Sequence, residues 1–528
     1  MSVAAEATRM GADPDRVRAA VAELYPADPV TVRETHISWV FLTRERAFKL
    51  KKPLVLSFLD YGTAARRRDM CREEVRLNAR LARDVYLGVR AVADHGDRLA
   101  IAADDDPAAI DYLVEMRRYD EQSTLAALAV HCAVTREHVT AVGARLAAFH
   151  SASPVRCGQR GSVAVRHEVQ ENLGELMAEP GGSAAPAQIA ALGRFLDAFV
   201  AANRTLFDAR ARRGLIREGH GDLRAEHVIV APHLSIVDCV EFDPGLRTLD
   251  VADDLAFLVM DLCALGADAS ARELIAAYRE SGGDPGSDEL VWFFAVHRAL
   301  IRAKVGLVRA EQTADRGASP RADVDHLLGI AERCAWRARG PLTLVICGVP
   351  ASGKSHLARA VAAAAGLPVI SSDLVRKELA GLSAHERGSS ALYQPEVSKR
   401  TYRELGRRAA MAITAGSGVL IDATFRRRAD RDAFAEGRGP TGSLTFVQCL
   451  ASAEVLRCRA VAREHDPHRA SDATPDVVER ERRRFDPLDD ANPAGHLVLR
   501  TDRDTGAVLA DLVALLDLRL AGDPVAAA

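Results

Sequence analysis

The sequence lacks the features that mark secreted, membrane-spanning and nucleic-acid-coating proteins. No apolar run approaches the roughly 20 residues that span a bilayer, and the segment Met1 to Glu6 has neither the basic nor the apolar region of a signal peptide. Its 9 cysteines are scattered without a C-x-x-C pair, which excludes a disulfide framework. A net charge of −3 attracts neither long nucleic acid nor an anionic membrane. These absences predict a soluble cytoplasmic protein.

Patterned runs of residues fill most of the chain. It has 528 residues, of which 48% are hydrophobic, enough for about two to four domains. Strand-like runs dominate from Val30 to Ile110, and helical runs dominate from Thr135 to about Ala310. Beyond Leu342, short apolar runs alternate with helical ones, which predicts a parallel sheet covered by helices.

An arginine-rich stretch from Ala335 to Pro341 is the predicted boundary between two domains, and we expect it to carry little core. The first domain would then span residues 1–335 and the second residues 342–528. Within the first, we expect a strand-rich lobe at about 30–115 and a helical lobe at about 116–335.

A glycine-rich motif opens the second domain. The run Leu342 to Cys347 is apolar and β-branched, the motif G-x-x-x-x-G-K-S follows it, and a helical run begins at His356. In this context the loop backbone cradles a phosphate chain at a helix N-terminus. Lys354 would reach the β- and γ-phosphates and take part in catalysis, and the Ser355 hydroxyl would ligate Mg²⁺. The eight residues of the motif are Gly348, Val349, Pro350, Ala351, Ser352, Gly353, Lys354 and Ser355.

Two further strands of this domain end in aspartate. Asp373 follows Pro368 to Ser372, and Asp422 follows Gly418 to Ile421. Ligands bind beyond the carboxyl ends of parallel strands, so Asp373 is placed to accept a proton from a substrate hydroxyl and Asp422 to support Mg²⁺. Arg376 lies one turn after Asp373 and could grip an anion. Asp373 could instead be a helix N-cap.

Arginines recur late in the chain, at positions 457, 459 and 463 and again from Arg480 to Arg484. They could close over a transferring phosphate, or they could form a solvated helix face. Together with the phosphate loop and the strand-end aspartates, this layout resembles P-loop kinases of the gluconate-kinase, polynucleotide-kinase and zeta-toxin type over residues of about 342–520.

A second polar cluster lies in the first domain. His220, Gly221 and Asp222 precede the apolar run Val228 to Val230, and a further strand ends in Asp238. One aspartate on a loop and another at a strand end can orient a hydroxyl nucleophile and hold Mg²⁺. The cluster resembles the catalytic and metal loops of aminoglycoside phosphotransferase-like kinases, which share the protein-kinase fold.

That resemblance extends over residues of about 30–310 and implies roles for individual residues. Asp222 would be the catalytic base, Asp238 a Mg²⁺ ligand and Lys49 the contact to the α- and β-phosphates, with Glu74 positioning Lys49. The stretch around Glu115 and Met116 looks like the hinge whose backbone receives adenine.

Some of these positions are open to other interpretations. Where the family has a metal-binding Asn, this chain has His227, and imidazole is a poor substitute for the oxygen ligands that Mg²⁺ prefers. Lys49 stands beside Lys51 and Lys52 and could be a solvated lysine, as either of those could. The segment Asp250 to Asp254 resembles a family motif but could simply cap a helix.

We therefore expect an α+β protein-kinase-like N-terminal half and an α/β P-loop NTPase C-terminal half with a parallel sheet. The implied cofactors are ATP and Mg²⁺. The leading hypothesis is a phosphotransferase with two ATP sites that phosphorylates small hydroxylated acceptors. One alternative is a regulatory ATPase whose first half is a degenerate, ligand-binding kinase. A weaker alternative is a nucleic-acid end kinase, suggested by Asp373 and Arg376.

Overall fold

A computed structural model describes residues 11–56, 59–156, 160–178, 185–312, 320–383, 386, 390–464, 475–488 and 495–522. Its contacts divide the chain into two compact units. The first unit comprises residues 1–168, 179–181 and 204–330, and the second comprises 169–178, 182–203 and 331–528.

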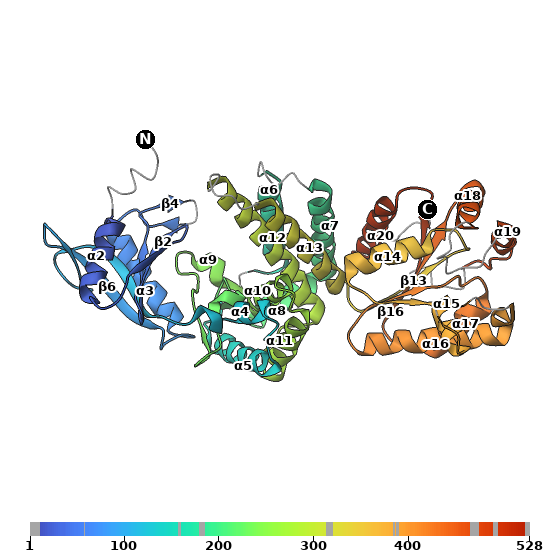
Figure 1. Ribbon diagram of the computed structural model, residues 1–528, viewed down its shortest axis with the longest axis horizontal. Helices are drawn as coiled ribbons and strands as arrows, with labels where there is room; N and C mark the ends of the chain where they lie inside the picture. Colours follow the sequence, from blue (N-terminus) through green and yellow to red (C-terminus); the bar gives the residue numbers. More distant parts are fainter. Residues whose placement is uncertain are drawn as a thin grey trace. The chain divides into compact units, whose positions relative to one another are not determined.

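The first unit begins with a six-stranded antiparallel sheet in the order β1-β2-β3-β8-β6-β7 (Figure 1). Helix α2, Pro14–Leu24, and helix α3, Ala64–Asn78, pack against this sheet. Asp13 begins α2 by accepting hydrogen bonds from the amides of Asp15 and Arg16. The strands are β1 Thr31–Glu34, β2 Ser38–Leu42, β3 Arg46–Lys51, β6 Tyr86–Asp94, β7 Leu99–Ala103 and β8 Ala109–Arg117.

Side chains alternate across β3, as they must in a strand. Phe48 and Leu50 join the apolar core that α2 covers. Lys49 and Lys51 therefore point to the opposite face, which α3 covers. The two lysines at positions i and i+2 thus reach one shared site.

The rest of the first unit is mainly helical. Helix α10 is buried along almost its whole length between α11 and α12, which gives this lobe its core. Short strands carry the polar loops. The helices are α4 Leu125–Val130, α5 Arg136–Ala152, α8 Arg204–Arg212, α9 Pro244–Arg247, α10 Val251–Ala264, α11 Asp268–Glu280 and α12 Asp288–Gln312, the short 3₁₀ turns are η1 Glu121–Ser123 and η3 Ala225–His227, and the strands are β4 Val55–Leu56, β5 Leu59–Asp60, β9 Ile216–Glu218, β10 Val228–Ile229, β11 Ser235–Ile236 and β12 Thr248–Asp250. Helices α6 Ser162–Ala178 and α13 Pro320–Ala338 each begin in the first unit and end in the second.

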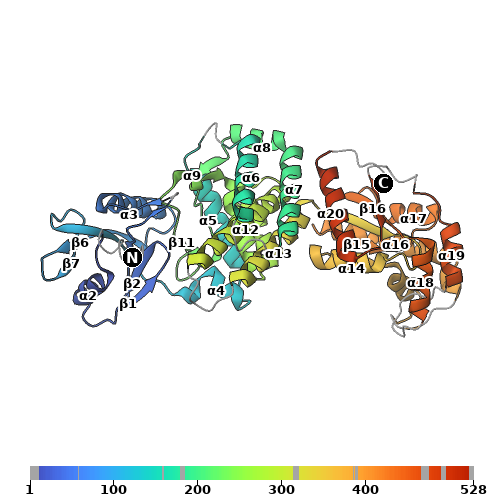
Figure 2. The ribbon, with the colours of Figure 1, turned by 90° about the horizontal axis from the view of Figure 1, so that it is seen from above.

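The second unit is built on a five-stranded parallel sheet in the order β14-β15-β13-β16-β17. Helices cover both faces, with α14 and α20 on one side and α16 and α17 on the other (Figures 1 and 2). The strands are β13 Leu342–Cys347, β14 Val369–Ser371, β15 Val419–Asp422, β16 Ser443–Leu450 and β17 His496–Arg500, and the helices are α14 Lys354–Ala365, α15 Ser372–Leu379, α16 Pro395–Thr414, α17 Arg428–Arg438, α18 Ala453–Glu464, α19 Pro475–Arg483 and α20 Thr505–Leu520, with the 3₁₀ turn η4 Ser390–Tyr393.

The central strand β13 is buried from end to end. Leu344 and Ile346 pack under α14 and α20, whereas Val345 and Cys347 pack on the opposite face. A continuous apolar run is therefore what this strand requires, because both of its faces are covered.

The arginine-rich stretch before β13 differs from the expectation that it carries little core. It forms the end of α13, and Trp336 is 5% exposed within the apolar core beneath α14 and α20. Arg339 forms a buried ion pair with Asp517 of α20 at 2.7 Å and lies 4.7 Å from the ring centre of Phe195. Phe195 belongs to helix α7, Pro186–Ala202, which also packs on α20. This charged stretch therefore contributes to the core, which its sequence did not indicate. The predicted domain limits remain a prediction.

Candidate active sites

The phosphate loop joins the buried end of β13 to the start of α14. Its backbone bends through three positive φ angles, at Gly348 (140°), Ala351 (68°) and Gly353 (90°). A Cβ added to Gly348 would lie 2.6 Å from the backbone oxygen of Cys449 and 2.8 Å from Ser352 Oγ. Only glycine fits at position 348, and the non-glycine Ala351 is held at an unfavourable backbone angle.

The two strand-end aspartates lie at the same edge of the sheet as this loop. Asp422 ends β15 and is in register with Ile346 of β13 and Ser371 of β14. Asp373 is in the first turn of α15, directly after β14. Ser371 occupies the N-cap position of α15, so Asp373 is not the helix N-cap. Because β14, β15 and β13 are parallel neighbours, their carboxyl ends gather both aspartates beside the phosphate loop.

Asp373 has an environment that suits a base. Burial raises the pKa of its carboxyl, although the charges of Arg376 and Lys354 act to lower it. Arg376 donates a hydrogen bond from Nη1 to Asp373 Oδ1 at 3.2 Å, and its guanidinium lies 4.8 Å from the ring centre of Tyr393. The pair thus combines a carboxylate that takes up protons readily with a cation beside it.

Several buried polar atoms around the loop have no hydrogen-bond partner among the described residues. A group of unsatisfied polar atoms is costly unless a ligand or water completes it. The atoms are Asp422 Oδ1, Ser352 Oγ, Arg376 Nε and Arg459 Nη1.

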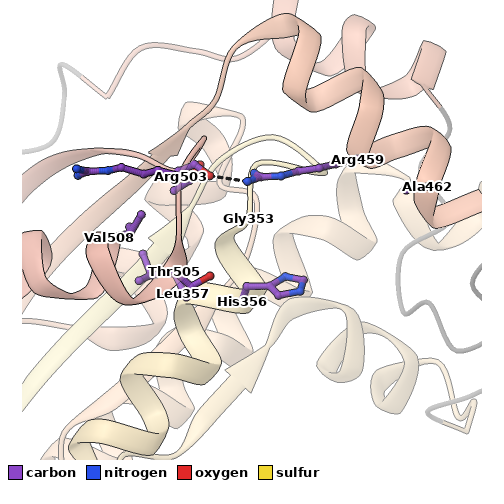
Figure 3. A pocket seen from close by; sticks show the side chains of 9 residues that line it. Gly353, His356, Leu357, Arg459, Ala462, Arg503, Thr505 and Val508 are labelled. Atoms are coloured by element: carbon purple, nitrogen blue, oxygen red, sulfur yellow. Dashed lines mark hydrogen bonds between the residues drawn. The ribbon is translucent and has the colours of Figure 1, made fainter.

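A cavity of about 320 Å³ opens beside the phosphate loop (Figure 3). Arg459 of α18 crosses its wall and donates from Nη2 to the backbone oxygen of Thr501 at 2.6 Å. The sequence interpretation included Gly353 and Arg459 but missed the lining residues from Thr501 to Val508, because no motif marks the segment that follows β17. The lining residues are Gly353, His356, Leu357, Arg459, Ala462, Thr501, Arg503, Thr505 and Val508.

The other arginines near the end of the chain have different surroundings in the structure. Arg457 is exposed on α18. Arg482 and Arg483 both bond Glu479 within α19, at 2.9 Å each, which is the pattern of a solvated helix face. The side chain of Arg463 lies outside the described residues.

In the first unit, Lys49 lies between two carboxylates. Its Nζ donates to Glu74 Oε1 at 2.9 Å and to Asp238 Oδ1 at 2.6 Å. Burial acts to lower the pKa of Lys49, but Asp238, Glu74 and Glu241 outweigh it and raise this pKa well above the usual value. Burial likewise acts to raise the pKa of Asp238, but Lys49 and His227 outweigh it and lower this pKa. The structure thus brings together the three residues that the sequence assigned to nucleotide and metal.

Lys51 forms a second, deeper cluster beside the first. It is fully buried and donates to Glu74 Oε2 at 2.6 Å and to Glu241. Tyr61 also donates to Glu241. Glu74 therefore binds both lysines of β3, one through each oxygen. The sequence interpretation allowed Lys51 to be a solvated lysine, which the structure contradicts; the alternation of β3 was the signal that places it with Lys49.

The loop after β9 is held by buried hydrogen bonds. His220 Nε2 donates to the backbone oxygen of Val237, and Asp222 donates its amide hydrogen to His220 Nδ1. Asp254 accepts from the amides of His220 and Gly221 at 2.7 and 3.0 Å. His220 therefore ties the loop that carries Asp222 to the segment that carries Asp238.

Asp222 and His227 both belong to this loop, and His227 Nε2 lies 3.7 Å from Asp238 Oδ2. The Asp222 side chain is 33% exposed, and its Oδ1 lies 3.4 Å from Arg224 Nε. His227 Nδ1 donates to the backbone oxygen of Asp222 at 2.8 Å. Asp238 itself has a φ of 65°, an unfavourable angle for a residue with a side chain. The strain places Asp238 between Lys49 and His227.

Glu115 and Met116 lie inside β8. Glu115 is opposite Phe48 of β3 and Gly88 of β6, and Met116 is opposite Ala47 and Tyr86. Strands flank both residues, which leaves few of their backbone groups available to adenine, and the hinge assignment stays a prediction.

Asp250 caps a helix, as one interpretation proposed. It is the N-cap of α10 and accepts from the amide of Ala252 at 2.8 Å. It also pairs with Arg210, while Asp253 pairs with Arg298. These buried acids stabilise the helical lobe, and only Asp254 contacts the loop that carries Asp222.

Within the described ranges, no helix is both long and apolar enough to cross a membrane. The same part of the chain contains no group of three or more His, Cys, Asp or Glu side chains arranged to hold a metal ion. Any divalent ion at either site would then need oxygen ligands from bound phosphates or water as well.

Comparison with known proteins finds two separate family matches along the chain. Residues 46–290 match the family described as "Phosphotransferase enzyme family", and residues 344–488 match the family described as "AAA domain". An uncharacterized protein of Mycobacterium tuberculosis and one of Mycobacterium bovis are each 35% identical over 469 residues, covering 86% of this chain and 90% of the relative.

Solved structures resemble each half separately. A gluconokinase from Sinorhizobium meliloti is 22% identical and covers 34% of this chain and 94% of its own, with a TM-score of 0.26. A choline/ethanolamine kinase family protein from Mesorhizobium loti is 14% identical and covers 61% of this chain and 94% of its own, with a TM-score of 0.37.

Proposed function

The chain belongs to the same two-domain family as these mycobacterial proteins, and we propose that it is an ATP-dependent phosphotransferase with two ATP sites. Each site would transfer a phosphoryl group to a hydroxyl of a small acceptor. The observation that carries the proposal is the gathering of Asp373, Asp422 and the phosphate loop at the carboxyl ends of three adjacent strands. This is the arrangement that phosphoryl transfer requires of an α/β sheet.

Mg²⁺ fits the chemistry of the P-loop site. Asp422 presents a buried oxygen without a partner among the described residues, and the Ser355 hydroxyl stands at the start of α14. These two residues would hold the ion, which when bound neutralises charge on the phosphates. Lys354 would contact the transferred phosphoryl group. Oxygen donors of this kind are what Mg²⁺ prefers.

The acceptor would bind beside Asp373. The raised pKa of this carboxyl supports a role as the base that takes the proton of the acceptor hydroxyl. Arg376 has a buried Nε without a partner in the described structure, which supports the binding of an anionic or strongly polar group of the acceptor. The nucleotide base would occupy the cavity of about 320 Å³ beside Gly353 and Arg459, a volume within the usual range of ligand pockets.

In the first unit, Asp222 would be the base and Lys49 would contact the α- and β-phosphates. Lys49 already lies within hydrogen-bond distance of Glu74 and Asp238, so its amine is held in position before a nucleotide arrives. Phosphate oxygens would compete with Asp238 for the same amine, and Asp238 would then be available to a divalent ion.

The second candidate function is a regulatory ATPase, in which the first unit only binds a ligand. One observation favours it. Asp238 Oδ1 is bonded to Lys49, while its Oδ2 faces the imidazole of His227 and not an oxygen ligand. A site of this kind could bind a nucleotide without transferring its phosphate.

The test is ATP consumption by the full-length protein against a library of sugars, aminoglycosides and nucleosides. Lys354→Ala removes a contact to the transferred phosphoryl group and should lower P-loop turnover on the order of 10²–10³-fold. Asp222→Ala should lower turnover at the other site, and Lys399→Ala, on the exposed face of α16, is the control.

Acceptor-dependent ADP release that survives each single variant and disappears in the double variant supports two kinase sites. Turnover abolished by Lys354→Ala alone, with ATP still bound elsewhere, supports the regulatory function. Unchanged turnover in the double variant would show that neither site is catalytic.

A further inference from the structure

Helix α10 carries two buried aspartates on one face, seven residues apart. Asp254 and Asp261 are 1% and 6% exposed. Seven residues make almost two full turns of an α-helix, so both side chains lie on the same side of α10, about 10 Å apart along its axis. A buried carboxylate is costly unless it is hydrogen-bonded. Each aspartate therefore needs its own donors.

The two aspartates hold opposite ends of the loop that carries Asp222. Asp254 accepts from the amides of the two residues that precede Asp222. Asp261 Oδ2 accepts from the amide of Ala225 at 2.8 Å. Because Asp222 lies between these points, the backbone on both sides of the proposed base is bonded to one helix.

Ala225 begins the 3₁₀ turn η3, and no side chain within the turn caps it. Arg224 occupies the N-cap position, but its side chain makes no capping hydrogen bond. Ala225 is fully buried, and an amide at the start of a helical turn has no partner inside that turn. Leaving such a buried amide unbonded is costly. Asp261 supplies the acceptor from a distant segment and so acts as the cap of η3.

A neighbouring ion pair shows what stabilisation alone would require. Asp253 and Asp261 both join α10 to α12, through Arg298 and Arg302 respectively. Both oxygens of Asp253 bond Arg298. Asp261 instead uses one oxygen for Arg302 and the other for the loop. Joining the two helices would not require that second bond.

We propose that Asp261 is a positioning residue of the first site, which fixes the place of Asp222 through the amide of Ala225. The inference rests on the proposed kinase activity of the first unit. Asp222 must lie within hydrogen-bond reach of the acceptor hydroxyl to take its proton, and a displacement of about 1 Å can lower such a rate about 10²-fold. Asp261 acts on the loop backbone, so its loss should lower kcat without altering the affinity for nucleotide.

The test compares two matched double variants. Asp261→Leu/Arg302→Met replaces one ion pair of α10 and α12 with apolar side chains and removes the acceptor of the loop amide. Asp253→Leu/Arg298→Met replaces the neighbouring pair and leaves the loop bond intact. Replacing both members of a buried ion pair with apolar residues is often neutral for stability, so both proteins should fold, which thermal unfolding measures.

The first measurement is ADP release by the full-length chain carrying Lys354→Ala, which silences the P-loop site. The acceptor is one that the library identifies, or water alone. Asp261→Leu/Arg302→Met should lower kcat by about 10–10²-fold and leave the KM for ATP unchanged. The control pair should leave both unchanged. Asp261→Asn, which keeps an acceptor oxygen for Ala225, should retain most of the parent kcat.

The second measurement is hydrogen exchange of the peptide that covers residues 223–228. In the parent protein this peptide should exchange slowly, because the amide of Ala225 is buried and bonded to Asp261. It should exchange faster in Asp261→Leu/Arg302→Met and at the parent rate in the control pair. Rapid exchange in the parent protein would overturn the inference without any variant.

The outcomes separate this inference from the function on which it rests. Equal kcat in the two double variants, whether or not exchange accelerates in one of them, would overturn the positioning role and leave the kinase activity standing. A loss of kcat in Asp261→Asn as large as in the double variant would also overturn it. A parent protein that binds no ADP, or releases none from ATP, would overturn the kinase function of the first unit itself.

Discussion

The two candidate sites differ in how their charged groups are satisfied before any nucleotide binds. In the first unit, Lys49 is held by Glu74 and Asp238. At the P-loop, Asp422 Oδ1 and Arg459 Nη1 have no partner in the described structure. In the first arrangement the site residues stabilise the unit itself. In the second, polar groups are left for a ligand to hydrogen-bond. The residues of the first site thus contribute more to the stability of the ligand-free protein than those of the P-loop site.

The largest effect should come from the buried lysine of the first unit. Lys51→Met leaves Glu74 and Glu241, which are 0% and 5% exposed, as charges without that partner. Breaking a buried ion pair in this way costs on the order of 3–5 kcal/mol. Hydrogen exchange across α3 in denaturant would measure the loss. Lys52→Met is the control, because its partner Glu34 is 63% exposed, and should cost less than about 1 kcal/mol.

A second variant makes this prediction sharper. Adding Glu241→Gln to Lys51→Met removes one of the uncompensated carboxylates and should recover part of the lost stability, because the two residues are coupled. Equal stability of Lys51→Met and the Lys52→Met control would show that the buried cluster contributes nothing to the fold.

An intermediate effect should come from a matched pair of aspartates. Asp238→Asn removes a carboxylate that pairs with Lys49, and should destabilise the first unit by roughly 1 kcal/mol, below the usual range for charged hydrogen bonds because Asp238 is 44% exposed. Asp422→Asn removes a carboxylate with an unsatisfied oxygen, and should leave the melting temperature of the free protein unchanged or higher. Each is measured by thermal unfolding without nucleotide. A larger loss for Asp422→Asn than for Asp238→Asn would reverse the comparison.

The smallest effect concerns pH. Burial raises the pKa of Asp373, so the folded state binds its proton more tightly than the unfolded chain does. Stability therefore falls as pH rises from the unfolded value of about 3.9 through the folded pKa. Asp373→Asn should stabilise the P-loop unit at pH 7 by less than about 1 kcal/mol, since the side chain is 34% exposed. That gain should vanish near pH 4.

Asp238 should show the opposite dependence. Its lowered pKa means that its contribution is present above the unfolded value of about 3.9 and is lost as pH falls through the folded pKa. The destabilisation caused by Asp238→Asn should thus be constant near neutral pH and fade in strong acid. Urea unfolding of both variants at pH 7, pH 4 and about pH 2.5 follows both dependences, and effects of the same sign at pH 7 for the two variants would contradict the pKa assignments.

Local sequence patterns were sufficient to predict much of the fold. Both fold classes are confirmed, and the run Leu342–Cys347 is strand β13. The P-loop and its strand-end aspartates were predictable because the parallel topology itself brings strand ends together.

Other features depend on contacts between distant segments, which no local pattern records. Lys51 resembles its neighbour Lys52 in sequence but is fully buried beside Glu241, 190 positions later. Arg339 carries a charge in an arginine-rich stretch, yet it pairs with Asp517 inside the core. The cavity wall at Thr501 becomes visible only when β17 and α20 are placed beside α18. Charge in the sequence does not distinguish a solvated residue from a buried, paired one.

The second unit is assembled from separate stretches of the sequence, which also bears on how such a protein could evolve. Helix α7 lies well before the phosphate loop in the sequence but packs on α20, and Trp336 completes the same core. A gene fusion joined near Leu342 would transfer the phosphate loop without these parts. Recombination that exchanges the P-loop half among relatives would therefore be tolerated only where α7, the end of α13 and α20 are inherited together.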